Sequence, residues 1–195
     1  MSSETSTRIL EAARERLLAD GYAALTTRGV AETADVPLSQ IHYHFGSKDE
    51  LILSLLREEN DLALERQIEM FGRELPLWRR WELACDYFDE DIESGYVRVL
   101  MEMTAAGWSS EVIRKEVKAI YSDWTALLTD VAREARSKGL ELGPLRPVDI
   151  SSLVAATFLG AETLILSDVE SDLSPLRESL RRVGTLIRAA EENAS

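Results

Sequence analysis

The sequence has few of the residues on which several protein classes depend. A single cysteine, Cys85, among 195 residues excludes an internal disulfide and makes a reducing compartment the natural setting. Only 10 glycines and 5 prolines are too few for a protein of many strands and turns, so we expect long helices with short connections. Disorder is not expected, because hydrophobic residues make up 45% of the chain and can form a substantial core.

The chain also lacks a long hydrophobic run and a targeting segment. Its longest apolar stretch, from Leu153 to Ala161, ends at Glu162 and is much shorter than the roughly 18 residues that cross a bilayer. The first ten residues, MSSETSTRIL, have no basic region followed by an apolar block, unlike a secretory signal. We expect a cytoplasmic protein with no membrane partner.

Positive charge is scarce, with 22 Lys and Arg against 35 Asp and Glu and a net charge of −13. Such a deficit argues against a nucleic-acid partner, because phosphate binding usually requires a basic excess. The deficit is uneven along the chain. Residues 1–56 carry five basic and eight acidic residues (−3), whereas residues 57–195 carry seventeen and twenty-seven (−10). The objection therefore applies mainly to the larger, C-terminal part.

Apolar residues recur at three- and four-residue spacing along most of the chain, which is typical of amphipathic helices. Glycine, proline and capping residues divide this pattern, and Ser47 with Glu50 is expected to form a capping box. The expected helices span about residues 7–19, 28–34, 38–45, 48–71, 77–93, 96–106, 107–138, 148–166 and 175–192, with loops at 139–147 and 167–174. We predict an all-α protein of about nine helices, in which the first three form a small unit and the rest a bundle.

The segment SQIHYHFGSKDEL, residues 39–51, contains both histidines of the chain. On an ideal helix that turns about 100° per residue, Leu38, Ile41 and Phe45 share the face that points to the core. The outward arc is polar or hydrogen-bonding, and consists of Ser39, Gln40, Tyr43 and His44 with His42 at its flank. A short helix with such an arc, preceded by another short helix across a tight turn, is typical of a helix-turn-helix.

Other interpretations of this segment follow from the same residues. His42 and His44 lie about 200° apart on a helix, so they cannot bind one metal ion together, and we expect no metal site. No Ser, Cys or carboxylate lies beside them as an activated nucleophile requires, so we expect no catalytic residue. The residues alone do not exclude two further interpretations of this polar arc: a face that only contacts water, or a contact surface for another protein.

The stretch LTTRGVAETADVPLSQIHYHFGSKDEL resembles the DNA-binding domain of the TetR family of bacterial transcription repressors, and the similarity covers about residues 7–56. In that family a threonine-started helix, a turn, a Tyr-x-x-Phe-like recognition helix and a Ser-Lys-(Asp/Glu)-x-Leu helix start occur at this spacing. The resemblance implies a helix-turn-helix domain at 1–50 and a ligand-sensing and dimerisation domain at 51–195. It also implies double-stranded DNA, a second copy of the chain and an unidentified small-molecule effector as partners.

The resemblance further implies DNA contacts by residues of the second, third and fourth helices: Thr27, Arg28, Ser39, Gln40, His42, Tyr43, His44 and Lys48. Gln40 can bond an adenine edge in two places. Lys48 and the free N–H groups in the first turn of the fourth helix would attract a phosphate. His42 departs from the family, which commonly has a tyrosine at this position.

The last two predicted helices are candidates for a dimer interface. A single small reading domain contacts few base pairs, so specific binding generally requires two copies. We expect two helices from each copy to form a four-helix interface that includes Leu153, Leu159, Leu176, Leu180, Val183 and Ile187. On the last helix, the apolar residues of this set form one stripe: Leu176, Leu180, Val183 and Ile187. The alternative is that this stripe packs on its own subunit.

Aromatic and methionine side chains are spread over the middle helices, and an internal space lined by them would suit an apolar or aromatic molecule. Core packing is the alternative for each of them. Glu162 lies within an apolar helix and either reaches water or an arginine or selects a polar group of a ligand. The candidate ligand-binding residues are Trp81, Phe88, Met101, Met103, Trp108, Tyr121, Trp124, Phe158 and Glu162.

We therefore expect a ligand-responsive repressor that binds a palindromic operator as a homodimer and is released by a small apolar or aromatic effector. The alternatives are a helical-bundle enzyme or carrier of small molecules, and a protein-interaction module. No nucleophile–base constellation, phosphate loop or metal spacing supports an enzyme, and no cofactor is expected.

Overall fold

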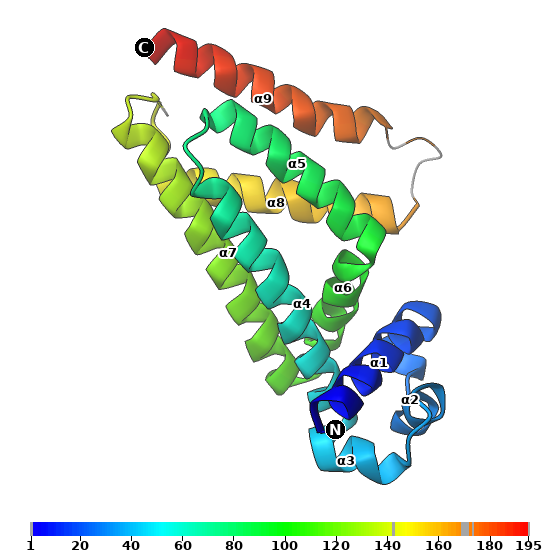
Figure 1. Cartoon of the computed structure of the whole chain (residues 1–195). Helices are drawn as coiled ribbons and strands as arrows, with labels where there is room; N and C mark the ends of the chain where they lie inside the picture. The colour runs from blue at the N-terminus through cyan, green and yellow to red at the C-terminus, as the bar shows by residue number, and fades with distance from the viewer. Residues whose placement is uncertain (1, 142, 169–171, 173, 195) are drawn as a thin grey trace. The chain divides into compact units, whose positions relative to one another are not determined.

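The computed structural model of the chain describes residues 2–141, 143–168, 172 and 174–194, and within them it contains nine α-helices and no strand (Figure 1). The predicted all-α fold class is confirmed. Parts of the two predicted loops, 139–147 and 167–174, lie outside the described residues. The helices are α1 (Ser2–Ala24), α2 (Thr27–Thr33), α3 (Leu38–Phe45), α4 (Lys48–Phe71), α5 (Leu77–Ser94), α6 (Tyr96–Ala106), α7 (Glu111–Ser137), α8 (Pro147–Leu166) and α9 (Ser174–Ala194).

Helix α1 differs most from the prediction, which placed it at about 7–19 and ended it at Asp20-Gly21. It begins earlier, at Ser2, where the polar residues give no apolar period to follow. Gly21 has φ 75° and ψ 164°, a conformation that glycine adopts at little cost, so the helical backbone is interrupted where the prediction ended it. The chain then resumes helical structure up to Ala24.

The chain divides into two compact units. The first consists of residues 1–62 and 95–120, and the second of residues 63–94 and 121–195. Helices α4 and α7 contribute to both units, because the divisions after residues 62 and 120 fall within them, whereas the division after residue 94 falls between α5 and α6. The predicted division into residues 1–50 and 51–195 follows the end of the helix-turn-helix motif and stays a prediction.

In the first unit, α1 packs on α2 and α6, and α2 packs on α3. Its core contains fully buried aliphatic side chains from several helices, among them Ile9, Leu17, Val30, Ile41 and Leu51. Arg57 of α4 donates two hydrogen bonds to the carboxylate of Glu116 in α7, at 2.8 and 2.7 Å. The unit thus combines an apolar core with polar contacts between helices.

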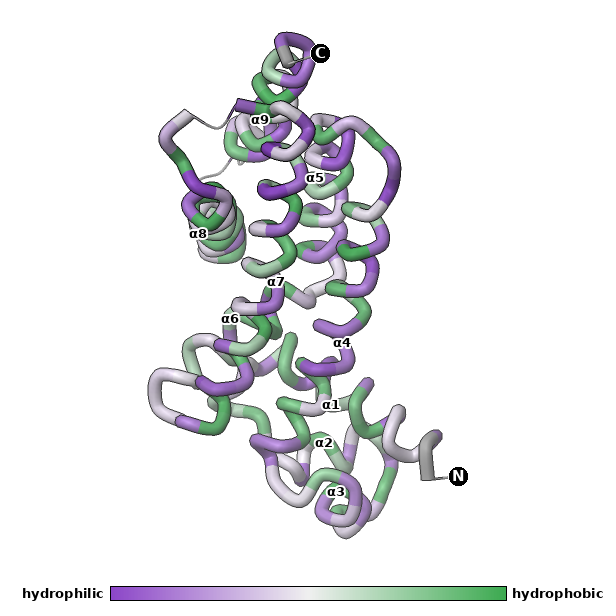
Figure 2. The backbone as a smooth tube through the Cα atoms, turned by 90° about the vertical axis from the view of Figure 1, so that its left-hand side faces the viewer, coloured by the Kyte–Doolittle hydropathy of each residue, from purple (hydrophilic) through white to green (hydrophobic). Residues whose placement is uncertain are grey.

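In the second unit, the centre of the core is the ring of Phe158 in α8. Trp81, Phe88 and Trp124 meet this ring edge-to-face, with centroid distances of 5.6, 5.3 and 6.1 Å. Helix α9 lies alongside α5 (Figure 1), and the indole N–H of Trp81 donates to the carbonyl of Leu180 at 2.7 Å. Hydrophilic and hydrophobic residues alternate along the helices (Figure 2), as expected where one face packs on a core.

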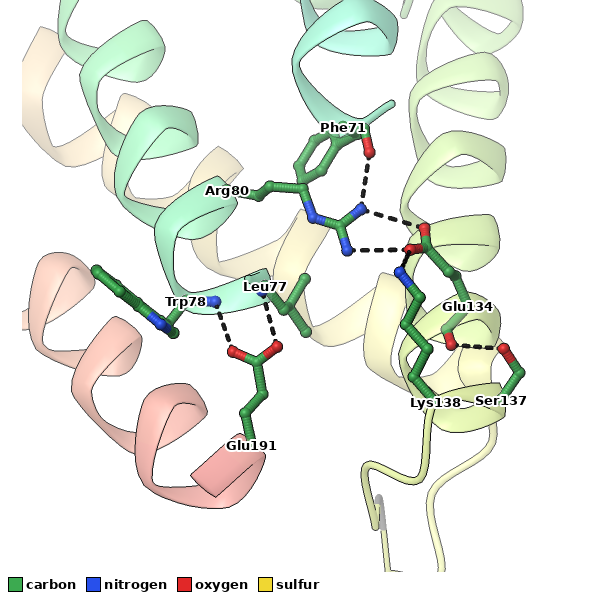
Figure 3. A network of polar contacts seen from close by, with 8 residues as sticks. All are labelled: Phe71, Leu77, Trp78, Arg80, Glu134, Ser137, Lys138 and Glu191. Atoms are coloured by element: carbon green, nitrogen blue, oxygen red, sulfur yellow. Dashed lines mark hydrogen bonds and ion pairs between the residues drawn. The ribbon is translucent and has the colours of Figure 1, made fainter. Parts of the chain in front are cut away.

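A buried arginine links three helices of the second unit (Figure 3). Arg80 of α5 is only 3% exposed, and its guanidinium donates to the carbonyl of Phe71 at 2.7 Å and to both carboxylate oxygens of Glu134 at 3.1 Å. Lys138 also donates to Glu134, at 2.6 Å. Hydrogen bonds from Arg80 and then Lys138 lower the pKa of Glu134 to about 2. Glu134 therefore stays ionised at neutral pH, and its negative charge balances the buried positive charge of Arg80.

The start of α5 is capped by a residue that is distant in the sequence (Figure 3). The carboxylate of Glu191 in α9 accepts hydrogen bonds from the backbone N–H groups of Leu77 and Trp78, at 2.8 and 3.1 Å. These N–H groups have no partner inside the helix, and the positive end of the helix dipole favours an anion there. Glu191 therefore fixes α9 against α5.

Candidate DNA-binding surface

The helix-turn-helix consists of α2, a short turn and α3. The hydroxyl of Thr26 caps α2 by accepting a hydrogen bond from the N–H of Gly29 at 3.1 Å. Asp35 has a positive φ of 51°, and the N–H of Val36 donates to the carbonyl of Ala31 at 3.0 Å. These contacts end α2 and direct the chain into α3, which begins directly after Pro37.

Arg8 of α1 braces this turn. Its guanidinium donates to the carbonyls of Ala34 and Asp35, at 2.6 and 3.0 Å. The carbonyls at the end of α2 carry the negative end of the helix dipole, so a cation is favoured there. Arg14 is likewise bound within the protein, in an ion pair with Glu59 at 2.5 Å. Both arginines therefore stabilise the fold of the first unit.

The exposure of α3 follows the helical arc expected from its sequence. Ile41 is fully buried and Leu38 and Phe45 are half-buried, whereas Tyr43 is 77% exposed. Ser39 and His42 are exposed as well, while Gln40 and His44 are half-buried. The rings of Tyr43 and His44 lie edge-to-face with centroids 5.0 Å apart. The exposed side of α3 is thus polar and carries the mostly exposed aromatic ring of Tyr43.

His42 helps to terminate α3. Its Nδ1 lies 3.1 Å from the carbonyl oxygen of Gly46, which itself has a positive φ of 75° and ends the helix. A carbonyl can only accept, so this contact requires the proton on Nδ1 and leaves Nε2 of a neutral ring as an acceptor. With this tautomer, Nε2 is the ring atom of His42 that can accept a hydrogen bond from another molecule.

The start of α4 lies beside this end of α3. The hydroxyl of Ser47 accepts a hydrogen bond from the N–H of Glu50 at 3.1 Å, which is one half of the predicted capping box. The other half does not form, because the N–H of Ser47 donates to the carbonyl of Phe45 at 2.8 Å. The reason is the tight connection at Gly46, which folds Ser47 back onto the end of α3.

Lys48 is held by Tyr22 of α1. Its ammonium donates to the backbone carbonyl of Tyr22 at 2.6 Å and also lies over the aromatic ring of Tyr22, 4.2 Å from the ring centroid. The hydroxyl of Tyr22 in turn donates to Asp49 at 2.6 Å, and burial followed by this contact raises the pKa of the phenol. An ammonium has three donors, so Lys48 keeps hydrogen-bonding capacity beyond its contact with Tyr22.

The predicted ligand-binding residues separate into distinct places. The structure brings together Trp81, Phe88, Trp124 and Phe158, and Glu162 lies one turn after Phe158 on α8. Tyr121 also belongs to the second unit. Met101 and Met103 belong to the first unit, where Met103 is fully buried. Trp108 is 82% exposed at the turn after α6, which corrects its assignment to an internal space.

The predicted dimer residues also differ in their surroundings. Leu180 is buried and, with Leu176, packs in the Phe158 cluster of the same chain, so neither has much area to offer a partner. A Cβ atom at Gly184 would lie 3.3 Å from the ring of Trp81, which shows that this part of α9 faces α5. Val183, Ile187 and Leu159 are half-buried, and Leu153 is 57% exposed.

Helix α8 is unusual in its apolar surface. Its length and apolar composition would be sufficient for a membrane-spanning helix, but core helices of soluble proteins often meet the same two criteria. Most of its residues are not buried within the described chain, so its hydrophobicity is not explained by its own core. Its exposed side includes Val148, Leu153, Ala156, Gly160 and Leu164.

Comparison with known proteins places these features among bacterial regulators. Residues 9–55 match the profile of bacterial regulatory proteins of the tetR family. The HTH-type transcriptional regulator UidR of Escherichia coli K12 is 26% identical over 175 residues, which cover 86% of this chain and 83% of UidR.

Two solved structures have the same fold. A transcriptional regulator from Saccharomonospora viridis in complex with choline superposes with a TM-score of 0.78 at 21% identity, covering 91% of this chain and 94% of that one. The regulator FadR from Bacillus subtilis in complex with stearoyl-CoA has a TM-score of 0.77 at 19% identity, with coverages of 91% and 96%.

Proposed function

We propose a regulatory cycle for this chain, which belongs to the TetR family of bacterial transcriptional regulators and is a helix-turn-helix DNA-binding regulator. In this cycle a cytoplasmic homodimer binds a palindromic operator, represses transcription and leaves the DNA when a small effector binds its second unit. The observation that carries the proposal is the exposed aromatic and polar side of α3, on a motif that Arg8 holds in shape.

We assign the DNA contacts to three groups of side chains. Ser39, Gln40 and His42 of α3 offer donors and acceptors for base edges in a major groove. Tyr43 and His44 extend this surface and can also reach phosphates. Thr27, Arg28 and Lys48 would hold the backbone, and these contacts position the protein without reading sequence. The acidity of the chain does not prevent this, because the excess of acidic residues lies mostly outside residues 1–56.

We assign the dimer interface to the exposed apolar side of α8, together with Leu186 of α9. Leu186 is exposed, as are Leu153 and Leu164, although all three are large hydrophobic residues. Contiguous exposed apolar residues usually mark an interaction site. A second copy can cover the same surface on both partners by a two-fold axis, with Ala156 and Gly160 permitting close approach. This moves the proposed interface away from Leu176 and Leu180.

Effector binding would act through the second unit. Complexes with choline and with stearoyl-CoA among solved structures of this fold support a small-molecule effector. An effector that binds better when the two α3 helices have the wrong separation shifts the population to that state and releases DNA. No catalytic step is part of the cycle, and UidR is likewise named as a regulator.

The first test removes the exposed ring of α3. We expect Tyr43→Ala to weaken binding to the DNA upstream of the protein's own gene at least about tenfold, which corresponds to the roughly 1–3 kcal/mol of a good base contact. Folding should be unaffected, because Tyr43 is mostly exposed. Gel-shift titration measures the affinity, and Trp108→Ala is the control, since it removes an equally exposed ring elsewhere. Equal affinities of Tyr43→Ala and the unchanged protein would contradict the assignment.

The second test concerns the interface. We expect Leu153→Glu to raise the dissociation constant of the dimer about 100-fold, because it buries a charge in an apolar contact. Sedimentation equilibrium measures this constant. Leu62→Glu is the matched control, since Leu62 is 65% exposed but lies on α4. The proposed interface would be refuted if the unchanged protein were monomeric at micromolar concentration. It would also be refuted if Leu153→Glu left the dissociation constant of the dimer unchanged.

A further inference from the structure

We propose that the effector is an organic cation, in which an ammonium group on an aromatic or apolar body binds to Glu162 among the rings around Phe158. This inference rests on the proposed function, because it names the chemical class that the second unit detects. It goes beyond an apolar or aromatic effector by requiring a positive charge.

The first observation is a buried carboxylate oxygen without a partner. Glu162 lies on α8 beside the buried Ala161 and one turn after Phe158, on the side of the helix that packs inward. Its Oε2 atom is buried, and no hydrogen-bond partner for it exists among the described residues. Leaving such an oxygen unpaired is costly, and native proteins do so rarely. A ligand that donates to this oxygen would remove the cost.

The second observation is the balance of charge around Glu162. Asp91 of α5 is the charged group whose field acts on it, and Asp91 is paired with Arg66 of α4 at 2.5 Å. Arg66 also pairs with Glu90 at 3.1 Å and stacks on the ring of Tyr87. Two carboxylates already match the one guanidinium, so Arg66 has no charge left to balance Glu162 when Glu162 is ionised.

The acid–base state of Glu162 agrees with this balance. Burial, and then the negative charge of Asp91, raise its pKa to about 8. A bound ammonium group would favour the carboxylate and lower this pKa, so binding should strengthen as pH rises towards 8. An anion at this place would instead be repelled by Asp91, and by Glu162 once Glu162 is ionised.

The third observation is the set of rings. Phe158 meets Trp81, Phe88 and Trp124 edge-to-face, and Trp81 and Trp124 are only half-buried. The faces of aromatic rings attract cations, and desolvated ammonium groups bind them most strongly. Phe88 and Asp91 lie one turn apart on α5, as Phe158 and Glu162 do on α8. The spacing is three residues on α5 and four on α8, so each helix places an acid about one turn after a ring.

Three probes of nearly the same shape separate charge from hydrophobicity: 2-phenylethylammonium, 2-phenylethanol and phenylacetate. Calorimetric titration of the full chain at pH 8.5 should show that the ammonium probe binds at least tenfold more tightly than the alcohol, and the carboxylate more weakly than both. In Glu162→Gln the preference for ammonium over alcohol should fall below about threefold. Glu178→Gln, which alters an exposed acid of α9, is the control and should keep the tenfold preference.

Two results would overturn the proposal: equal binding of the ammonium and alcohol probes to the unchanged protein, or a preference that survives in Glu162→Gln. Absence of any binding by the ammonium probe at millimolar concentration would overturn it as well. A gel shift of the unchanged protein distinguishes these failures from failure of the proposed function. DNA binding without cation preference refutes only the ligand class, whereas absence of DNA binding refutes the regulatory function itself.

Discussion

Replacement of Glu134 by alanine is expected to lower the free energy of unfolding by about 2 to 3 kcal/mol. The variant removes the carboxylate that balances Arg80, whose side chain is buried, and leaves Phe71 as its remaining acceptor in this network. Breaking a buried pair by deleting one partner typically costs roughly 3–5 kcal/mol, because an uncompensated charge stays in the interior. We expect less here, since Glu134 is 37% exposed and water can reach Arg80 once the carboxylate is gone.

Urea denaturation followed by circular dichroism measures this loss. Asp130→Ala is the matched control, because Asp130 lies one turn earlier on α7 and pairs with Arg133 at the exposed surface. Such exposed pairs contribute less than about 1 kcal/mol, so the control should unfold almost like the unchanged protein. A Glu134→Ala variant as stable as Asp130→Ala would show that the buried guanidinium does not depend on its carboxylate.

The stability of the protein should also decrease between pH 4.5 and about 8 by an amount that depends on Glu162. Its pKa is 4.5 in an exposed glutamate and about 8 in the folded chain. In this window the folded state keeps a proton that the unfolded state has released, so stability falls as pH rises. A shift of this size corresponds to at most about 5 kcal/mol, and we expect about 2 kcal/mol after relaxation of the site.

The measurement compares the unchanged protein with Glu162→Gln, so that the titration of other groups largely cancels. At pH 5 the two should have nearly equal stability, because a protonated carboxyl and an amide are similar in shape and charge. At pH 9 Glu162→Gln should be more stable by about 2 kcal/mol. Asp91 remains paired with Arg66 in both proteins. A difference that is the same at pH 5 and pH 9 would mean that Glu162 is not desolvated in the folded chain.

Local patterns predicted the helices and the helix-turn-helix well. The helical period placed Ile41 towards the core and Tyr43 towards solvent, and the structure buries the first and exposes the second. Thr26 caps α2, and threonine is one of the residue types that sequences commonly place before a helix. Such features depend on residues within one or two turns of each other, and a sequence displays these directly.

Residue type alone could not decide which aromatic residues meet. Trp81 and Trp124 pack on Phe158, whereas Trp108 is exposed at a turn. All three are tryptophans on or beside predicted helices, so nothing in their local sequence separates them. The stripe on α9 was likewise visible as a pattern, but only the position of α5 shows that Leu176 and Leu180 pack within the chain.

The sequence by itself determined the helices, their order, the polar arc of α3 and the resemblance of this segment to tetR-family regulatory proteins. Only the tertiary structure decided that Arg8 braces the turn after α2, that Arg80 pairs with Glu134, and that Glu191 caps α5. These partners lie 26, 54 and 114 residues apart in the chain. Helical periodicity extends over neighbouring turns, whereas the partner of a buried charge depends on which helix faces it after folding.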